Sequence, residues 1–352
     1  MQNRIIRIAL ALAGCILLTA GCIRRSDLGS DGTPIGFAAG STLLRDDATK
    51  AGTLKTGNQF TTGDKIAVFG WHDAIGGFIF NDQPVELKSS GRWEYAPVQP
   101  WEWGTSGDFY DFLAIYPFRA SAPLPSVVSS PRVIVSQSYS TSDQCDLMMG
   151  GVRRKEEEND RNRTVPFVFH HLCCAVRVLI YNDSQQKDFT LNAYSFQNVA
   201  SQAVARVQIV DDAATFGWTE AQRSAATPVG GASGIGQTLS HGSSGPGYTG
   251  DADLLIPMLL TEELGTGTGI WPKLVVNFTK DGSAEAEELE VNLKDICRLD
   301  EHDVETQEPI QQWERGVLYT YKIHIKVDGG IVVHVVTTDW DVVEAETPGL
   351  LI

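Results

Sequence analysis

The chain has 352 residues, of which 42% are hydrophobic, and a formal net charge of −16 at pH 7. This length and apolar content are sufficient for two domains with ordinary hydrophobic cores. The strong negative charge opposes binding to nucleic acid, because the phosphate backbone is recognised by basic surfaces.

Residues 1–21 have the pattern of a secretion signal. A short basic region is followed by an apolar run over residues 8–18 and then by small residues before Cys22. This run is shorter than the roughly 20 apolar residues that a permanent membrane helix needs. The segment LTAGC at residues 18–22 is typical of the lipobox of bacterial lipoproteins, so we predict that Cys22 receives a lipid. A plain signal peptide or an uncleaved anchor is the alternative.

We predict two domains after this signal. Residues 22–33 are polar and contain glycine and serine, as in a tether. The first domain is predicted at residues 34–155 and the second at residues 162–352. Between them lies the run RRKEEENDR at residues 153–161, and so many charges without an apolar partner cannot be buried.

The body of the chain has the pattern of β-strands. Alternating or β-branched runs occur at residues 65–70, 109–116, 132–136, 165–181, 189–196, 204–210, 254–260, 274–279, 288–293, 318–327 and 331–336. No long segment has a convincing helical period, so we predict an all-β fold of sandwiches or barrels. The glycine- and serine-rich stretch at residues 230–250 is predicted to be a long loop.

The C-terminal end has the pattern of a β-hairpin. Tyr319, Tyr321 and Ile323 alternate with polar residues, as in a half-buried strand. The sequence DGG at residues 328–330 then predicts a tight turn, and the apolar run at residues 331–336 returns beside the first strand.

Four cysteines remain available for pairing, since Cys15 is removed with the signal and Cys22 is predicted to carry the lipid. These are Cys145, Cys173, Cys174 and Cys297. Cys173 and Cys174 are adjacent on a predicted strand, so their side chains face opposite sides and cannot easily bond each other. A single bridge from either of them to Cys145 or Cys297, or four free thiols, are both compatible with the sequence.

Two motifs resemble ligand sites but lack the required context. The glycine-rich segment GASGIG at residues 231–236 has no buried strand before it and no helix after it, so we do not predict a nucleotide cofactor. The segment HHLCC at residues 170–174 places its imidazoles and thiols on opposite faces of a strand. No metal site is therefore predicted.

No residue pattern indicates an enzyme. The sequence holds no recognisable carboxylate pair at catalytic separation and no serine in a nucleophile elbow. Trp71, Trp93, Trp101 and Trp103 are a candidate platform for stacking on sugars, although packing in a core or loop is the competing interpretation.

The sequence resembles the fimbrillin family, the subunits of type V pili. The resemblance is carried by PIGF at residues 34–37, ATKAG at 48–52, FTTGDKIAVFGW at 60–71, DLMMG at 146–150, VPFVFHHL at 165–172, WERGVLYTYKI at 313–323 and Trp340. It spans nearly the whole chain.

This resemblance implies two transthyretin-like β-sandwich domains, export as a lipoprotein and assembly with other pilus subunits by strand exchange. A protease would cut after a basic residue, here Arg45 or Lys50, and the first strand with residues 35–37 would leave. The strand of a neighbouring subunit would then fill the groove. The candidate donor strand contributes Ile331, Val332, Val333 and Val335.

We therefore predict a non-enzymatic structural subunit of an adhesive surface pilus, held at the outer membrane by the lipid on Cys22 until it is processed. An uncut anchor or tip subunit is a variant of this prediction. A different alternative is a surface lipoprotein that never polymerises and binds glycan through Trp101 and Trp103. A secreted hydrolase of unrecognised type would need a carboxylate pair in a cleft.

Overall fold

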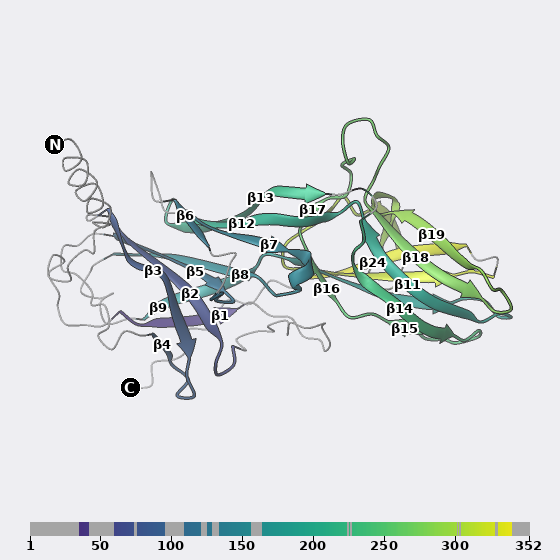
Figure 1. Cartoon of the computed structure of the whole chain (residues 1–352), viewed down its shortest axis with the longest axis horizontal. Coiled ribbons are helices and arrows are strands. Elements are labelled where there is room, and N and C mark those ends of the chain that lie inside the picture. The colour runs from purple at the N-terminus through teal and green to yellow at the C-terminus, as the bar shows by residue number, and fades with distance from the viewer. Residues whose placement is uncertain are drawn as a thin grey trace, which may run out of the picture.

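A computed structural model describes most of the chain that follows the predicted tether. The described residues are 35–41, 60–73, 76–95, 109–120, 125–128, 134–155, 164–223, 225, 227–300, 302, 304–327 and 330–339. Within them every regular element is a β-strand except two 3-10 turns of three residues each. The prediction of an all-β fold is thus confirmed. Figure 1 shows an elongated molecule built from two groups of strands.

The first group contains a closed barrel. Its strands follow one another in the order β1 (Phe37–Ser41), β4 (Trp93–Tyr95), β3 (Gly77–Leu87), β2 (Lys65–His72), β5 (Phe109–Tyr116), β8 (Met148–Lys155) and β9 (Val165–His171). Alternate side chains point inwards, because successive residues of a strand face opposite sides. The interior is packed with apolar side chains, among them the rings of Phe37, Phe60, Phe80, Phe112 and Phe167. The barrel is therefore a core and not a channel.

A four-stranded sheet covers one side of this barrel. Its order is β13 (Ala213–Arg223), β12 (Ala200–Val210), β7 (Ile134–Ser140) and β6 (Ser126–Val128). A second core lies between the sheet and the outer side of the barrel, and it includes Leu113 of β5 and Ile209 of β12. A Cβ atom on Gly151 would come within 2.9 Å of Leu113 and 3.1 Å of Ala214. The absence of a side chain at Gly151 therefore allows the two layers to approach closely.

The second group of strands consists of two sheets that enclose a third core. One sheet contains β15 (Tyr248–Thr249), β10 (Cys174–Asn182), β23 (Val317–Ile325), β24 (Ile331–Asp339), β20 (Cys297–Leu299) and β21 (Glu305–Pro309), with β16 (Asp253–Leu255) also paired to β10; the other contains β14 (Val229–Leu239), β11 (Phe189–Gln197), β18 (Lys273–Lys280) and β19 (Ala286–Asn292). Trp313 lies in the short strand β22 (Gln312–Trp313), which pairs with β17 (Met258–Leu259). Its Nε1 donates a hydrogen bond of 2.9 Å to the Tyr321 hydroxyl inside this core.

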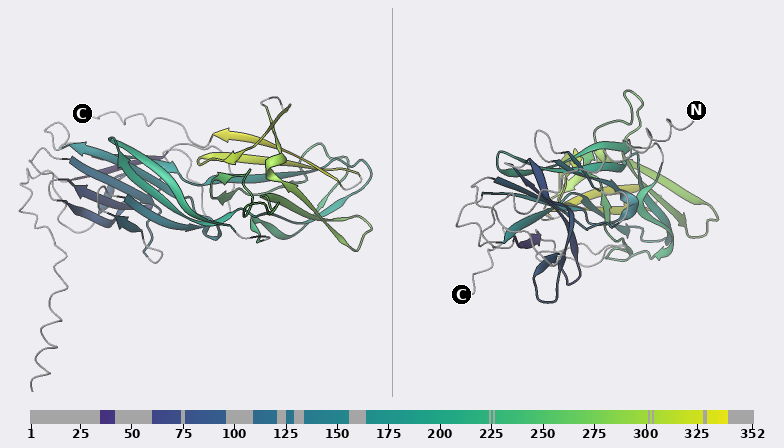
Figure 2. Two further views of the ribbon diagram at one scale, coloured as in Figure 1. Left: turned by 90° about the horizontal axis from the view of Figure 1, so that it is seen from above. Right: turned by 60° about the vertical axis from the view of Figure 1, so that its left-hand side comes forward.

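The chain passes between the two groups more than once. β9 belongs to the barrel and β10 to the second group, whereas β12 and β13 return to cover the barrel (Figure 2). Leu172 and Cys173, between β9 and β10, belong to the second core, and Cys174 belongs to the third. The proposed division at residues 155 and 162, and the transthyretin-like form of each domain, remain predictions.

Two expectations about irregular segments are wrong. Arg153 was expected in a solvated charged run, but it lies in β8, where Nε donates to Asp111 Oδ1 at 2.7 Å and the side chain is only 17% exposed. The glycine-rich segment expected to be a loop forms β14 as far as residue 239. It pairs with β11 through two register shifts. Gly230 and Gly231 adopt positive φ, a conformation that glycine allows without strain.

The four described cysteines, Cys145, Cys173, Cys174 and Cys297, are free thiols in the structure. Cys173 and Cys174 are fully buried and lie in different cores, so the prediction that they face opposite sides is confirmed. Burial raises the pKa of both thiols, which favours the protonated and unreactive form.

A buried polar pair joins β9 to the segment before β8. The ring of His171 approaches Asp146 with 2.8 Å between Nδ1 and Oδ1, and the two side chains are 0% and 1% exposed. A buried carboxylate depends on its polar partners, because no water replaces them.

We predict that His171→Ala lowers the free energy of unfolding by about 3–5 kcal/mol, because the substitution leaves Asp146 buried without this partner. The matched control is His241→Ala, which removes a contact to Asp188 on the surface and is expected to cost far less, because solvent screens an exposed pair. Urea unfolding of both variants measures the difference. Equal losses would contradict the assignment of a structural role to the buried pair.

Candidate functional site

β1 is the strand that the strand-exchange prediction requires to be displaceable. It closes the barrel by pairing in parallel with β9 over five residues and with β4 through the single pair Phe37 and Trp93. Ile35 and Phe37 are 1% and 4% exposed, and their side chains point into the barrel. Ala38, the next residue of the strand, is half-buried. The strand thus contributes a buried face to the barrel, although it is only five residues long.

Aromatic rings surround the side chain of Phe37. Its ring centroid lies 5.3 Å from that of Phe80, 5.7 Å from Tyr95, 6.1 Å from Phe112 and 5.9 Å from Phe167, which stacks on it. Edge-to-face and offset contacts at these distances add to the free energy of burial. We call this set of four rings the Phe37 cage.

The backbone before β1 is held by two further hydrogen bonds. The Tyr95 hydroxyl donates to the carbonyl of Ile35 at 3.0 Å, and the Val165 amide donates to the carbonyl of Gly36 at 2.8 Å. A Cβ atom on Gly36 would lie 3.3 Å from Thr164, so the site is tight at this position. A strand that replaced β1 would need a large apolar residue at the positions of Ile35 and Phe37 and a small one between them.

Three of the predicted site residues, Cys22, Arg45 and Lys50, lie outside the described residues. Their lipidation and processing remain predictions. Arg45 and Lys50 fall between β1 and Phe60 in sequence, so a cut at either would separate β1 covalently from the rest of the barrel.

The candidate donor strand lies inside its own sheet, as β24. It pairs with β23 over nine residues and in parallel with β20 at His334 and Val335. Val333 and Val335 are 9% and 0% exposed and Ile331 packs against the third core, whereas Val332 is 40% exposed. Donation of this strand would therefore require it to leave two neighbours and a core.

Asp183 holds the end of β10 to the hairpin that contains β24. Its carboxylate accepts hydrogen bonds from His324 and Lys326, and its amide donates to the carbonyl of Ile325 at 2.9 Å. Burial alone raises the pKa of Asp183, but the hydrogen bonds from Lys326 and His324 outweigh it and hold the pKa below its ordinary value. The ionised carboxylate therefore stabilises this end of the sheet.

The proposed tryptophan platform is not present as a set. Trp93 is buried in the barrel, where it packs edge-on against Phe60, and Trp71 packs against Phe78. Trp101 and Trp103 lie outside the described residues. The interpretation of Trp93 as part of an exposed platform is therefore wrong, and core packing is the correct one.

The histidine and cysteine motif is likewise divided. His171 contacts Asp146, whereas the ring of His170 lies 4.9 Å from that of Phe216. Among the described residues, no group of three or more His, Cys, Asp or Glu has a geometry that could hold a metal ion. The described residues also contain no helix that is long and apolar enough to cross a membrane.

A family model described as fimbrillin-like matches residues 49–340. The chain belongs to the fimbrillin-like family. Membership implies a place on the cell surface or in a fimbrium and association with other pilus subunits. The match covers the barrel strands from β2 onwards and all of the second group of strands.

Three solved structures illustrate proteins to which this fimbrillin-like chain is similar. A proposed cell adhesion protein from Bacteroides ovatus has 12% identity and a TM-score of 0.49, covering 88% of this chain and 99% of that one. The fimbrilin FimA of Porphyromonas gingivalis has 8% identity and a TM-score of 0.41, covering 87% and 98%. The tip fimbrial protein Mfa3 of the same species has 11% identity and a TM-score of 0.39, covering 79% and 95%.

No curated protein matched the chain in a sequence comparison. The family assignment therefore depends on the family model alone.

The sequence predicted a first strand at residues 35–37, whereas β1 runs over Phe37–Ser41, and it gave no indication of the Phe37 cage. Phe80 lies in β3, which was not predicted as a strand, and Tyr95 lies in the three-residue strand β4. Alternation of Phe78 and Phe80 was the available signal for β3. Nothing local to either segment indicates that both approach Phe37.

We predict that Phe37→Ala destabilises the uncut chain by about 3–5 kcal/mol, because it leaves a cavity inside the Phe37 cage. Ala38→Ser, at a half-buried position on the same strand, is the control and should change stability by about 0.5 kcal/mol or less. Chemical denaturation measures both. Similar values for the two variants would show that β1 does not seal the barrel.

We predict that the stabilising effect of Asp183 disappears in acid. A carboxyl with a lowered folded-state pKa stabilises the fold above its ordinary pKa, and this contribution is lost as the pH falls through the folded-state value. The difference in unfolding free energy between the wild type and Asp183→Asn should thus be present at about pH 7 and shrink as the pH falls below the ordinary aspartate pKa of about 4. Urea titrations across this range test it, and a constant difference would exclude the ionic explanation.

Proposed function

We propose that this fimbrillin-like chain is a structural, non-enzymatic subunit of an adhesive surface fimbria that assembles by protease-triggered strand exchange. The observation that best supports this proposal is the position of β1. This strand completes the barrel, but along the chain the segment that contains Arg45 and Lys50 lies between it and Phe60. A cut in this segment would leave β1 held only by non-covalent contacts.

Loss of β1 would expose both apolar surface and unpaired backbone. The Phe37 cage would lose its central ring, and the facing edges of β4 and β9 would lose their partner. An incoming strand of matching pattern removes both costs at once, as in other cases of strand addition. Repeated head-to-tail addition of this kind yields an open filament.

In this proposal Cys22 carries the lipid that holds the precursor at the outer membrane. Cleavage after Arg45 or Lys50 would cut the chain between β1 and the rest of the protein. The body would then be free of the lipid anchor, and β1 would remain on the anchored fragment. A subunit that escapes cleavage would keep its lipid and serve as an anchor at the membrane.

We expect purified precursor treated with an arginine- or lysine-specific protease to form ladders on unheated denaturing gels. Replacement of both Arg45 and Lys50 by Ala should abolish the ladder and leave the monomer intact. Mass spectrometry of the N-terminus in material from intact cells identifies the residue that is cut. A chain that is cut at Arg45 or Lys50 and stays monomeric would rule out the polymerising function.

The candidate donor β24 can be tested separately by locking it to β23. Thr320 and Val336 are directly paired across these strands, so Thr320→Cys with Val336→Cys should permit a bridge of ordinary geometry. If β24 is the donor, oxidation of this double variant blocks the ladder and a reductant restores it. Equal polymerisation in both redox states would exclude β24 and leave the proposal for β1 untouched.

A further inference from the structure

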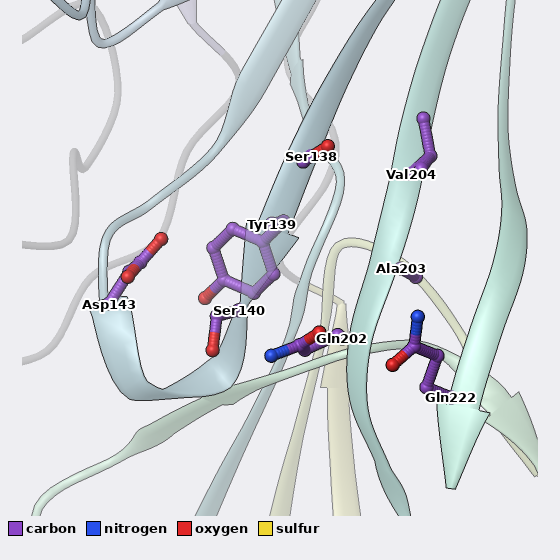
Figure 3. A pocket seen from close by; sticks show the side chains of 8 residues that line it. All are labelled: Ser138, Tyr139, Ser140, Asp143, Gln202, Ala203, Val204 and Gln222. Carbon is purple, nitrogen blue, oxygen red and sulfur yellow. The ribbon is translucent and has the colours of Figure 1, made fainter. Parts of the chain in front are cut away.

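A hollow opens on the outer side of the sheet that covers the barrel. Its volume is about 320 Å³, and the residues that line it come from β7, β12, β13 and the turn after β7. Figure 3 shows these side chains. The cause of the hollow is local: the register between β12 and β13 shifts twice, once on each side of Gln202. Such bulges bend a sheet and re-aim its side chains. The volume falls at the lower end of the range of small-molecule sites, about 300–1,000 Å³.

The floor of the hollow is a row of polar side chains across three strands. Gln202 is paired with Ser140 of β7 on one side and with Gln222 of β13 on the other. Ser138 and Val204 form the neighbouring pair and add a hydroxyl and one apolar surface. The row thus combines amides and hydroxyls, each of which can both donate and accept hydrogen bonds.

Several of these groups are available to a ligand. Within the residues that the structure describes, the Ser138 hydroxyl and the side-chain amides of Gln202 and Gln222 make no hydrogen bond. Gln202 and Gln222 are exposed, and in Figure 3 the Gln202 amide is directed towards Ser140.

The rim of the hollow, in contrast, is held rigidly. It is formed by the 3-10 turn at Thr141–Asp143, which Ser140 caps by accepting a hydrogen bond from the Ser142 amide at 3.3 Å. Gln144, in a left-handed conformation, fixes the turn to Leu254: its Oε1 accepts from the Leu254 amide at 3.0 Å. A rigid rim reduces the conformational entropy that is lost when a ligand binds.

The one charged group of the lining is already neutralised. Both Arg119 Nη1 and Nη2 donate to Asp143 Oδ2 at 3.1 Å, and this pair lies at the edge of the hollow. An anionic ligand would meet a carboxylate, and a cation would compete with Arg119. The lining therefore favours an uncharged ligand that is rich in hydroxyl groups.

We propose that this hollow binds a neutral saccharide unit. Vicinal hydroxyls of a sugar ring would exchange hydrogen bonds with the amides of Gln202 and Gln222 and the hydroxyl of Ser138, while Val204 would pack against ring C–H groups. The site lies on the flank of the covering sheet, whereas the Phe37 cage lies inside the barrel. The proposal is therefore independent of strand exchange and applies to the uncut chain.

The test uses the uncut full-length chain and a panel of neutral probes: the methyl glycosides of glucose, mannose and galactose, N-acetylglucosamine, maltose and lactose. Sialyllactose serves as the anionic comparison. Saturation-transfer NMR and calorimetry are expected to detect saturable, millimolar binding of at least one neutral probe and weaker binding of sialyllactose than of lactose. Gln202→Ala and Gln222→Ala should each weaken the binding roughly tenfold, because each removes a pair of hydrogen-bonding groups.

The matched control is Gln208→Ala, which changes the same residue type on the same strand but opposite Thr215 and Ile134, outside the hollow. It should leave affinity unchanged, and thermal unfolding should be similar for all three variants. The proposal is overturned if no neutral probe binds saturably, if sialyllactose binds better than lactose, or if the two hollow variants bind as the control does.

Discussion

Closure of the barrel depends on a five-residue strand that makes one pair with β4 and five with β9. The seam is short in backbone pairing and rich in apolar contact, because Phe37 lies between rings from four other strands. Most of its stabilisation therefore comes from burial of one side chain and not from the length of the ladder. The proposed strand exchange would therefore depend on how well an incoming strand fills the Phe37 cage.

The rest of the first group of strands does not depend on that seam. The second core lies on the other side of the barrel wall, where β2, β5 and β8 meet the covering sheet. An opening between β4 and β9 would leave this core in place, since its members come from different faces of the strands. In the proposed exchange, the second core would therefore persist while β1 is replaced.

The connection between the two groups of strands is built from polar as well as apolar contacts. Trp218 of the covering sheet donates to the carbonyl of Leu172 at 2.8 Å, and the Tyr139 hydroxyl donates to the carbonyl of Leu254 at 3.3 Å. Leu172 lies between β9 and β10, where the chain enters the second group. Leu254 lies in β16, which pairs with β10. The first of these hydrogen bonds is partly buried and the second is buried, so breaking them leaves polar groups poorly solvated, which resists relative movement of the two groups.

Local patterns were sufficient to predict the class of fold and many of its strands. Residues 109–116 were predicted as a strand from their apolar run, and β5 has the same bounds. The pattern failed for β14, because glycines with positive φ and a bulged edge resemble a loop in sequence. It also missed β13, whose small residues at Ala213, Ala214 and Gly217 have no strong strand preference.

The sequence alone was sufficient to predict an all-β chain with a lipoprotein signal and to recognise its resemblance to the fimbrillin family, because alternation and short motifs are properties of neighbouring residues. Only the tertiary structure decided that β1 closes a barrel, that β24 lies between two partners, and that Ser140, Gln202 and Gln222 share a row. These facts depend on which strands pair, and pairing joins residues far apart in the chain. No local pattern contains that information.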